Sequence, residues 1–445
     1  MSRSLASLRL VVCASVACAG AAGVNVAQAT TRRVPTDVAS IGGALALSGT
    51  LDTVLVAPGT YTEQLTLPTG VTLRADGPKG SVTVDANLFG PCVTAIGTGP
   101  ATRLEGLRLV RGRGMDEGGA TVGGALRVAG GVLLVVECTF EDAQATFGGG
   151  TAATLANVTF RDCEWSGTSA SFGGGHFQAG GDLRLERARF LQTSAARGGG
   201  VHVTGGAHAV IDGALFDRTE ASSDGGGAWF DACVATVSEA LFDRARADDR
   251  GGGLAVAAGG QVLASFLAFV ECESGGGGGA FHVSCDPARP QSPGGAAGTL
   301  GADCALLSLT NADILLARGA SPAAGAVTDA GVVRIRSSIV AGNASGLSCL
   351  DPRATLDVTC TDLYENSGPD LSGTCEPASD PNGLTLDPHL CDLVLRDFSL
   401  CANSPLLDPG CGDSFWGRSG EGCATCGPTP ATDSSWGRLK ARYHR

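Results

Sequence analysis

The chain has 445 residues, including 68 glycines and 17 cysteines, and a formal net charge of −13. Glycine does not recur at every third position and hydrophobic residues make up 43% of the chain, which excludes a collagen-like or a disordered-linker composition. The acidic excess argues against a nucleic-acid partner and against binding to anionic membranes.

The first 29 residues are typical of a Sec export signal. Arg3 and Arg9 provide a basic start, residues 10–23 form a short apolar stretch, and residues 27–29 read Ala-Gln-Ala, a cleavage site. An alternative is a lipoprotein that is cleaved before Cys18 and acylated there. The sequence therefore predicts export to the extracellular space, or to the cell surface or outer membrane of a bacterium.

A glycine cluster recurs through the middle of the chain at intervals of 25–27 residues, and phenylalanine follows five of the seven clusters by 15 or 16 residues. Two markers with one period predict a solenoid. We expect an all-β, right-handed parallel β-helix over residues 30–366, with roughly a dozen coils of about 25 residues. The last glycines of the clusters are Gly124, Gly150, Gly175, Gly200, Gly227, Gly253 and Gly279, and the phenylalanines are Phe140, Phe190, Phe216, Phe242 and Phe269.

The stacking of coils explains both markers. A single coil is too small to bury its own apolar face, so like residues must lie over like residues at the strand spacing of about 4.8 Å. Phenylalanine rings then fill the interior, and glycines permit tight turns with positive φ and close backbone approach. One coil departs from the spacing, because Phe160 follows Gly150 by only ten residues, and we interpret it as irregular.

The repeat is interrupted by residues 285–304, a Pro/Gly-rich excursion that we expect a Cys285–Cys304 disulfide to close. The most apolar run, residues 254–270, is broken by glycine and polar residues and is too short for a transmembrane helix. Residues 367–426 are expected to form a disulfide-rich C-terminal cap or tail, with eight cysteines between Cys349 and Cys426.

Two alternatives remain for the C-terminal region. A zinc site at Cys423 and Cys426 is the alternative to disulfides, although no second Cys pair or His pair has ligand spacing. Residues 427–445 are expected to be a flexible tail, and the basic, aromatic segment 436–445 is either a frayed terminus or a sorting or attachment element.

Three stretches carry a resemblance to known families. Residues 52–63, with Ala-Pro-Gly-Thr-Tyr at 57–61, resemble the opening coil of secreted β-helix proteins, including pectinesterase-like sequences. The Gly-Gly-Ala-Leu at 123–126, followed by phenylalanine, resembles the G-G-A-[IL] and F-x-x-N repeats of polymorphic outer-membrane proteins. Residues 360–405 are similar to a Cys-rich ending found behind such helices. Threonine replaces the asparagine at Thr193 and Thr219, so an asparagine ladder is not expected.

No catalytic constellation is recognisable, and we expect no cofactor and no metal. Polygalacturonase-like motifs are degraded and misordered at residues 175–177, 311–313 and 334–336. Asp248 and Asp249, an adjacent carboxylate pair, precede a glycine turn and are interpreted as solvated. The histidines at 176, 202 and 282 follow their clusters by one, two and three residues, which predicts three different columns.

Arg127, Gln178 and His282 each follow a cluster by three residues, so we expect them to share one column. That column is either a polar strip that contacts sugars or a solvated face.

The function that these patterns favour is a non-catalytic exported β-helix that mediates adhesion or binds glycans, with a polysaccharide or another cell-surface component as its partner. The alternatives are a polysaccharide-active enzyme, either a pectate-lyase-like protein or a glycoside hydrolase, and a structural spacer.

Overall fold

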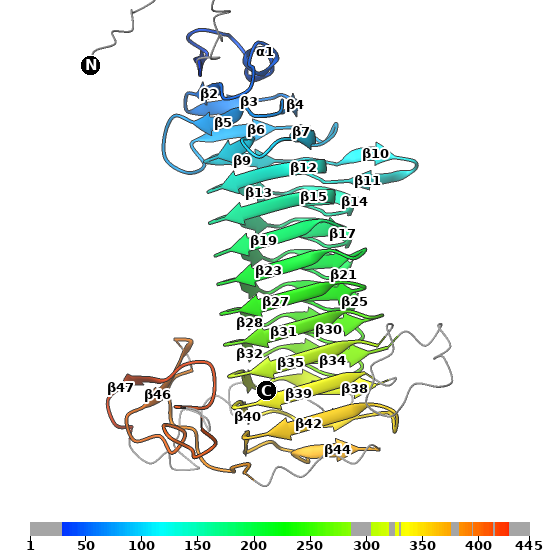
Figure 1. Cartoon of the computed structure of the whole chain (residues 1–445), viewed down its shortest axis with the longest axis vertical. Helices are drawn as coiled ribbons and strands as arrows, with labels where there is room; N and C mark the ends of the chain where they lie inside the picture. The colour runs from blue at the N-terminus through cyan, green and yellow to red at the C-terminus, as the bar shows by residue number, and fades with distance from the viewer. Residues whose placement is uncertain are drawn as a thin grey trace, which may run out of the picture.

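The computed structural model describes residues 29–426, apart from 286–303, 320–324, 329–330, 375–381, 394 and 413. Within these residues the chain forms a rod of about 14 parallel β-coils stacked along one axis (Figure 1). The predicted all-β parallel β-helix is therefore confirmed. The expected signal peptide up to residue 28, with Cys18, and the expected tail 427–445 lie outside the described residues. No helix in the described part of the chain is long and apolar enough to cross a membrane.

Three parallel sheets form the walls of the rod, and we call them the long, middle and short sheets. The long sheet has 23 strands: β1 (Thr31–Val34), β2 (Thr53–Val56), β4 (Leu65–Thr66), β5 (Thr72–Ala75), β7 (Val93–Thr98), β8 (Arg103–Glu105), β12 (Leu126–Val136), β15 (Thr151–Arg161), β18 (His176–Ala179), β19 (Asp182–Glu186), β22 (Val201–Thr204), β23 (His208–Asp212), β26 (Ala228–Asp231), β27 (Val234–Ser238), β30 (Leu254–Ala257), β31 (Gln261–Ser265), β34 (Phe281–Ser284), β35 (Leu306–Thr310), β38 (Gly325–Thr328), β39 (Val332–Arg336), β41 (Leu347–Cys349), β42 (Thr355–Thr359) and β44 (Leu371–Gly373).

The other two walls are narrower. The middle sheet has 12 strands: β3 (Gly59–Tyr61), β6 (Val82–Asp85), β9 (Leu107–Val110), β13 (Thr139–Glu141), β16 (Glu164–Ser166), β20 (Arg189–Leu191), β24 (Leu215–Asp217), β28 (Leu241–Asp243), β32 (Ala268–Val270), β36 (Asp313–Leu315), β40 (Ile339–Ala341) and β43 (Asp362–Tyr364). The short sheet has nine strands: β10 (Met115–Glu117), β11 (Ala120–Val122), β14 (Gln144–Phe147), β17 (Ser169–Phe172), β21 (Ser194–Arg197), β25 (Glu220–Asp224), β29 (Arg246–Ala247), β33 (Glu273–Ser274) and β37 (Arg318–Gly319).

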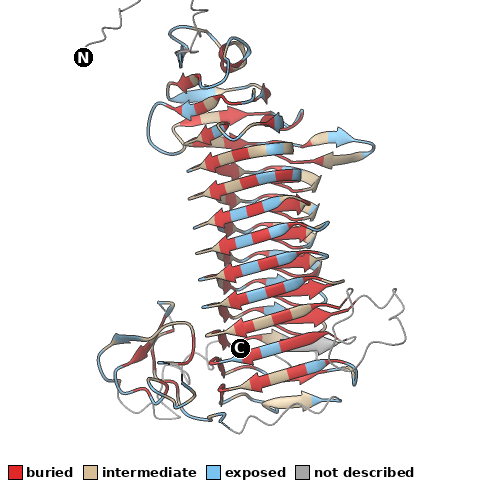
Figure 2. Ribbon diagram, in the orientation of Figure 1, coloured by how far each residue is buried: buried red, intermediate tan, exposed pale blue. Residues whose placement is uncertain are grey.

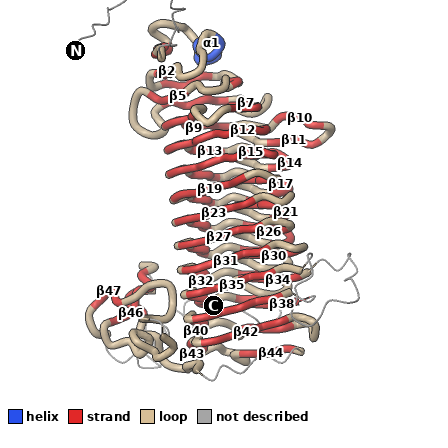
Figure 3. The backbone as a smooth tube through the Cα atoms, in the orientation of Figure 1, coloured by secondary structure: helices blue, strands red, loops and turns tan. Residues whose placement is uncertain are grey.

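The coil of residues 176–200 shows how the sequence bends the chain (Figure 3). Gly180 and Gly181, with φ of 68° and 75°, separate β18 from β19. Arg187 and Gln192, with φ of 52° and 54°, lie before and after β20. Each bend is thus made by residues in the left-handed region, and a glycine cluster returns the chain to the next coil.

Side chains in the straight segments alternate between the interior and the solvent, as Figure 2 shows by its bands of colour. In β19, Leu183 and Leu185 are buried while Asp182 and Arg184 are exposed. The period of two follows from the pleat of a β-strand. Because the next coil is paired in register, Ala209 and Ile211 continue the same buried columns.

A ladder of stacked aromatic rings fills the interior beside the middle sheet. The ring centroids of Phe216 and Phe242 are 4.5 Å apart, and those of Phe242 and Phe269 are 4.8 Å apart. Trp165 pairs with both Phe140 and Phe190 and occupies the missing place in the ladder. The expectation of an irregular coil at Phe160 was therefore wrong, because an indole stacks in this column as a phenyl ring does.

The glycines of the ladder provide the surface against which these aromatic rings pack. A Cβ atom at Gly200 would lie 2.6 Å from Cδ1 of Phe216, so the ring packs directly on bare backbone. Two of the predicted glycines of this ladder are displaced by one residue. Gly124 and Gly279 precede the equivalent positions, which are Ala125 and Ala280: the amide of Ala125 donates to the carbonyl of Gly150, and that of Gly253 to the carbonyl of Ala280.

A short helix, α1 (Ile41–Ala46), covers the N-terminal end of the rod (Figure 1). The Ser40 side chain caps it by accepting a hydrogen bond from the Gly43 amide at 3.1 Å. Ile41 and Leu45 are buried and belong to the interior cluster of the coils. At the other end the coils continue to β44, beyond the expected boundary at residue 366.

An asparagine ladder exists over the last two coils, contrary to expectation. The Asn343 side chain donates to the Ile314 carbonyl and to Asn366 Oδ1, and Asn366 donates to the Val340 carbonyl. The amides replace the threonines of earlier coils at the same position and satisfy buried carbonyl groups.

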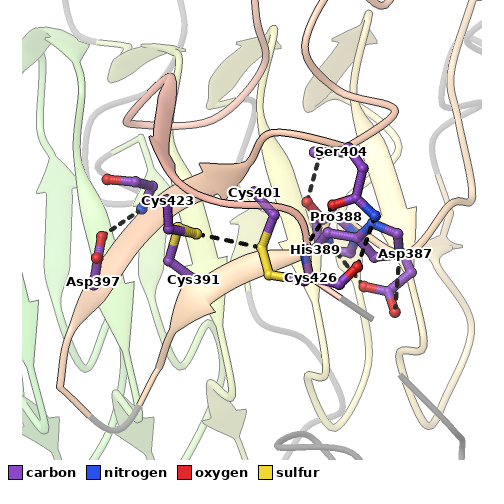
Figure 4. Close-up of a disulfide and its surroundings, with 11 residues drawn as sticks. Asp387, Pro388, His389, Cys391, Asp397, Cys401, Ser404, Cys423 and Cys426 are labelled. Atoms are coloured by element: carbon purple, nitrogen blue, oxygen red, sulfur yellow. Dashed lines mark hydrogen bonds and ion pairs between the residues drawn. A yellow bond between two sulfur atoms is a disulfide. The ribbon is translucent and has the colours of Figure 1, made fainter. Parts of the chain in front are cut away.

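The Cys-rich subdomain, residues 382–426, contains β45 (Leu390–Asp392), β46 (Asp397–Cys401) and β47 (Glu421–Cys423). Disulfides join Cys391 to Cys423 and Cys401 to Cys426 within it, as Figure 4 shows. A third, Cys360–Cys411, ties it to the rod. The zinc alternative at Cys423 and Cys426 is therefore wrong, because both thiols are used in disulfides. Cys285 and Cys304 are buried on either side of the undescribed residues 286–303, and their pairing stays a prediction.

The subdomain lies against the flank of the rod rather than over its end (Figure 1). Phe398, Leu406 and Trp416 of the subdomain share one buried cluster with Ile339 and Leu315 of the middle sheet. Burial of this cluster supplies the free energy of docking, at about 25 cal/mol per Å² of apolar surface. The expected terminal cap is instead a side domain.

Candidate functional site

The predicted strip of Arg127, Gln178 and His282 does not form. Arg127 and His282 share an outward column of the long sheet, whereas Gln178 lies in the neighbouring inward column, between Ala153 and Val203. The prediction was wrong because Gly124 and Gly279 precede the true ladder positions by one residue.

All three side chains are buried. Arg127 Nε donates to Glu117 Oε1 at 2.7 Å, and Glu117 belongs to the β10–β11 hairpin. Gln178 donates to the carbonyls of Ala156 and Gly180. These residues therefore belong to the wall of the rod and are shielded from solvent.

The histidines also serve the structure. His202 and His282 share the column of Arg127, which corrects the expectation of three separate columns, and His176 points inward. His202 Nε2 lies 2.6 Å from Asp231 Oδ1, and the Trp229 indole donates to the same oxygen. Burial lowers the pKa of His176 to about 4 and that of His282 to about 3, so both rings are neutral at physiological pH.

An accessible groove lies elsewhere, along the corner between the middle and short sheets. It consists of two adjoining depressions of about 490 and 410 Å³. They share Ser194, Glu220 and Arg246, so they form one continuous groove. The groove crosses six successive coils between residues 170 and 318, which corresponds to roughly 24 Å at the strand spacing of about 4.8 Å.

Two columns of side chains line the groove, and both are rich in charge. The first column lies on the short sheet and alternates in sign; it reads Ser194, Glu220, Arg246, Glu273 and Arg318. The second lies at the left-handed turn after each middle-sheet strand; it reads Gln192, Arg218, Arg244, Glu271 and Leu316. Because each column is fixed by strand register, the charges recur at intervals of about 4.8 Å.

Aspartates of the middle sheet orient two of the arginines. Arg218 Nη2 donates to Asp217 Oδ2 at 2.9 Å, and Arg244 Nη2 donates to Asp217 at 3.2 Å and to Asp243 at 3.1 Å. The hydrogen bond with Asp217 raises the pKa of Arg218; burial opposes the rise for Arg244, but Asp243 and Asp217 outweigh it. The two side chains remain 52% and 45% exposed, so fixed cations face the groove.

The glutamates of the groove are partly neutralised by other arginines. Glu273 lies 4.0 Å from Arg318, and Glu271 lies 3.3 Å from Arg396 of the Cys-rich subdomain. Arg246, in contrast, has one ion pair within the described residues, with Asp248 at 3.8 Å. The groove is therefore lined by four arginines and four carboxylates, and three of the arginines, Arg218, Arg244 and Arg246, lie in two successive coils.

Sequence reasoning missed this groove, although a signal was present. Charged residues stand two and four positions after the ladder phenylalanines, as in Phe242-Asp-Arg-Ala-Arg246 and Phe269-Val-Glu-Cys-Glu273. One group of possible metal ligands is present in the described residues, Cys391, Cys401 and Cys423, and its thiols belong to disulfides.

No protein-family model and no curated protein matches the sequence. Among solved structures, the chain is similar to the Dettilon tailspike protein gp208, with 11% identity and a TM-score of 0.39 over 77% of this chain and 68% of that one. It is also similar to PfbA, a surface adhesin of Streptococcus pneumoniae, with 10% identity and a TM-score of 0.36 over 74% of this chain and 85% of that one.

A third similar structure is the polygalacturonase from Erwinia carotovora ssp. carotovora, with 11% identity and a TM-score of 0.33 over 81% of this chain and 95% of that one. Similarities this low carry no argument about activity. The resemblances of the first coil to pectinesterases and of the repeats to polymorphic outer-membrane proteins stay predictions.

Proposed function

We propose that this protein is an exported β-helix that binds an extended acidic glycan in the charged groove without cleaving it. The observation that carries the proposal is the exposed row of Arg218, Arg244 and Arg246 in a groove that spans six coils. Arginine binds carboxylate and sulfate groups through two parallel hydrogen bonds, and its binding geometry is fixed in advance when a second group orients it.

The shape of the groove supports a chain-like ligand. It is long and open, and successive coils offer similar positions along its length. Side chains on regular strands hold their positions more precisely than side chains on loops do. A glycan chain lying along the rod would therefore meet a row of fixed charges and the hydroxyl group of Ser194.

A glycoside hydrolase is the second candidate, and one observation favours it. Glu220 and Glu273 lie in the same column two coils apart, which corresponds to roughly 9.6 Å between their backbones. Inverting glycosidases hold their two carboxyl groups roughly 6.5–9.5 Å apart. Binding is the better-supported function because Glu273 is within ion-pair distance of Arg318.

The test is a comparison of polygalacturonate, a sulfated glycan and a neutral glucan with the purified mature protein, following both binding and chain ends. We expect binding of the acidic chains and no new reducing or unsaturated ends. The variant R244Q/R246Q should lose roughly 100-fold in affinity, since each charged hydrogen-bonding group contributes about 1.5–3 kcal/mol.

A matched control is R184Q/R187Q. Arg184 and Arg187 are 51% and 60% exposed, compared with 45% and 61% for Arg244 and Arg246, and they lie outside the groove. The control removes the same charge and should bind normally. Release of new chain ends that is abolished in E273Q would favour the hydrolase. Equal losses of affinity in R244Q/R246Q and R184Q/R187Q would contradict the proposal that the groove is the binding site.

A further inference from the structure

A second cavity lies between the rod and the Cys-rich subdomain. Its volume is about 410 Å³, and none of its lining residues lines the groove. The rod contributes Glu239 and Phe266, and the subdomain contributes residues 396–399 and 418–419. The subdomain is held in place by the Cys360–Cys411 disulfide and by its buried cluster, so the cavity is a fixed part of the molecule.

Arg418 is a cation in this cavity, and its guanidinium makes no close ion pair with the described residues. Its backbone amide donates to Asp313 Oδ1 at 3.0 Å, and its Nη2 donates to the Glu239 carbonyl at 3.3 Å. Burial lowers the pKa of Arg418, and the nearby charges of Asp313 and Glu239 oppose that shift without an ion pair to its guanidinium. A partly desolvated guanidinium that has no direct ion pair can bind an anionic group through its free N–H donors.

Phe266 provides an independent indication. It adopts the left-handed conformation, with φ of 56°, and its side chain is 36% exposed in the cavity wall. The equivalent turns of neighbouring coils use Glu239 and Asn311, since left-handed turns favour small or polar residues. Phe266 therefore leaves part of its apolar surface exposed in the cavity wall, where a ligand can contact it.

The remaining groups complete a recognisable set. Ser399 and Ser419 provide hydroxyls, and Glu239 and Asp397 provide carboxylate oxygens that accept hydrogen bonds from hydroxyl groups. Arg396 is occupied by Asp243 and Glu271 and leaves Arg418 as the available cation. We propose that this cavity binds a single anionic sugar unit, with its carboxylate on Arg418, its apolar ring face on Phe266, and its hydroxyls on the carboxylates and serines. This site is separate from the groove.

The test is titration of the full-length mature protein with galacturonate and, for comparison, neutral galactose, followed by NMR and calorimetry. We expect a Kd on the order of 1 mM for galacturonate and at least roughly tenfold weaker binding of galactose. F266N should weaken galacturonate binding at least roughly fivefold through loss of the aromatic face. R418Q should abolish the preference for the acidic sugar.

F266N is the decisive variant because asparagine tolerates the left-handed backbone, so the fold should be kept. Its matched control is L155N: Leu155 is also left-handed, with φ of 50°, and is 78% exposed, but lies outside the cavity. Unchanged galacturonate binding in F266N, or equal binding of galactose and galacturonate, would overturn the proposal. Loss of monosaccharide binding in R244Q/R246Q but not in F266N would place the sugar in the groove and overturn it as well.

Discussion

The packing of a phenyl ring on bare backbone is the contact that repeats most regularly in this molecule. Gly200 lies against Phe216, and Gly253 lies against Phe269, each with room for hydrogen but not for a methyl group. Interiors are packed as densely as organic crystals, so an added methyl must displace the ring or the backbone of the next coil.

Replacement of Gly200 by alanine should therefore destabilise the protein by about 1–3 kcal/mol, as overpacking does. Thermal or urea unfolding measures this. Gly49 is the control, because a Cβ atom there meets nothing within 4 Å and its φ is ordinary, so G49A should be nearly neutral. Equal effects of the two substitutions would contradict the packing argument.

Two buried carboxyl groups should make stability depend on pH. Asp313 and Asp362 are fully buried where the subdomain meets the middle sheet, and Oδ2 of each has no hydrogen-bond partner within the described residues. Burial raises the pKa of both to about 7, with Arg418 opposing the rise at Asp313, and with Asp387 and Asp370 adding to it at Asp362.

The folded protein therefore binds more protons than the unfolded chain between pH 3.8 and about 7. Stability contributed by these groups is greatest below that window and falls as pH rises through it. We expect D313N and D362N, which mimic the neutral acid, to flatten this decline between pH 5 and 8 in urea unfolding. If the free energy of unfolding falls with pH in both variants as steeply as in the wild type, other titrating groups cause the decline.

At the scale of single elements, the Cys-rich subdomain depends on its disulfides more than the rod does. Trp416 is fully buried where the subdomain meets the rod. Reduction removes the Cys360–Cys411 tie and both internal disulfides.

We expect reduction to shift the fluorescence of Trp416 to longer wavelength, while the β-sheet circular dichroism of the rod persists, because the coils hold together by stacking alone. W416F provides the reference spectrum. Simultaneous loss of both signals would mean that the rod and the subdomain unfold as one unit.

The coils were predictable from the sequence because their stabilising contacts recur at one period. The same regularity explains the errors. Trp165 was not predicted as a ladder residue because the repeat was defined by phenylalanine, whereas an indole fills the same column. Gly124 and Gly279 were misplaced because Ala125 and Ala280 replace glycine at the ladder position near its two ends.

The candidate site was predictable to a lesser degree. The charged residues of the groove follow the ladder phenylalanines in the sequence. Their grouping into one groove depends on the turn geometry that places the two columns side by side. The docking of the subdomain joins residues as far apart as Asp243 and Arg396, and no local pattern encodes such a contact.

At the scale of the whole molecule, the groove predicts a dependence on ligand length. Arg218 and Arg318 lie in different coils along the groove, so an oligosaccharide must span several coils to contact both side chains. Affinity should rise with each added acidic sugar until the groove is filled and should then level off, which calorimetry with a series of defined oligogalacturonates measures. Affinity independent of length would indicate a single subsite.

The helix α1 has a consequence for the association of one molecule with another. A stack of parallel coils ends in a strand whose backbone groups invite a further strand, and identical rods joined end to end would grow into fibres. By laying Ile41 and Leu45 over the first coil, α1 places a non-β element where the next rod would begin. We therefore expect its few residues to hinder end-to-end stacking at the N-terminal end of the rod.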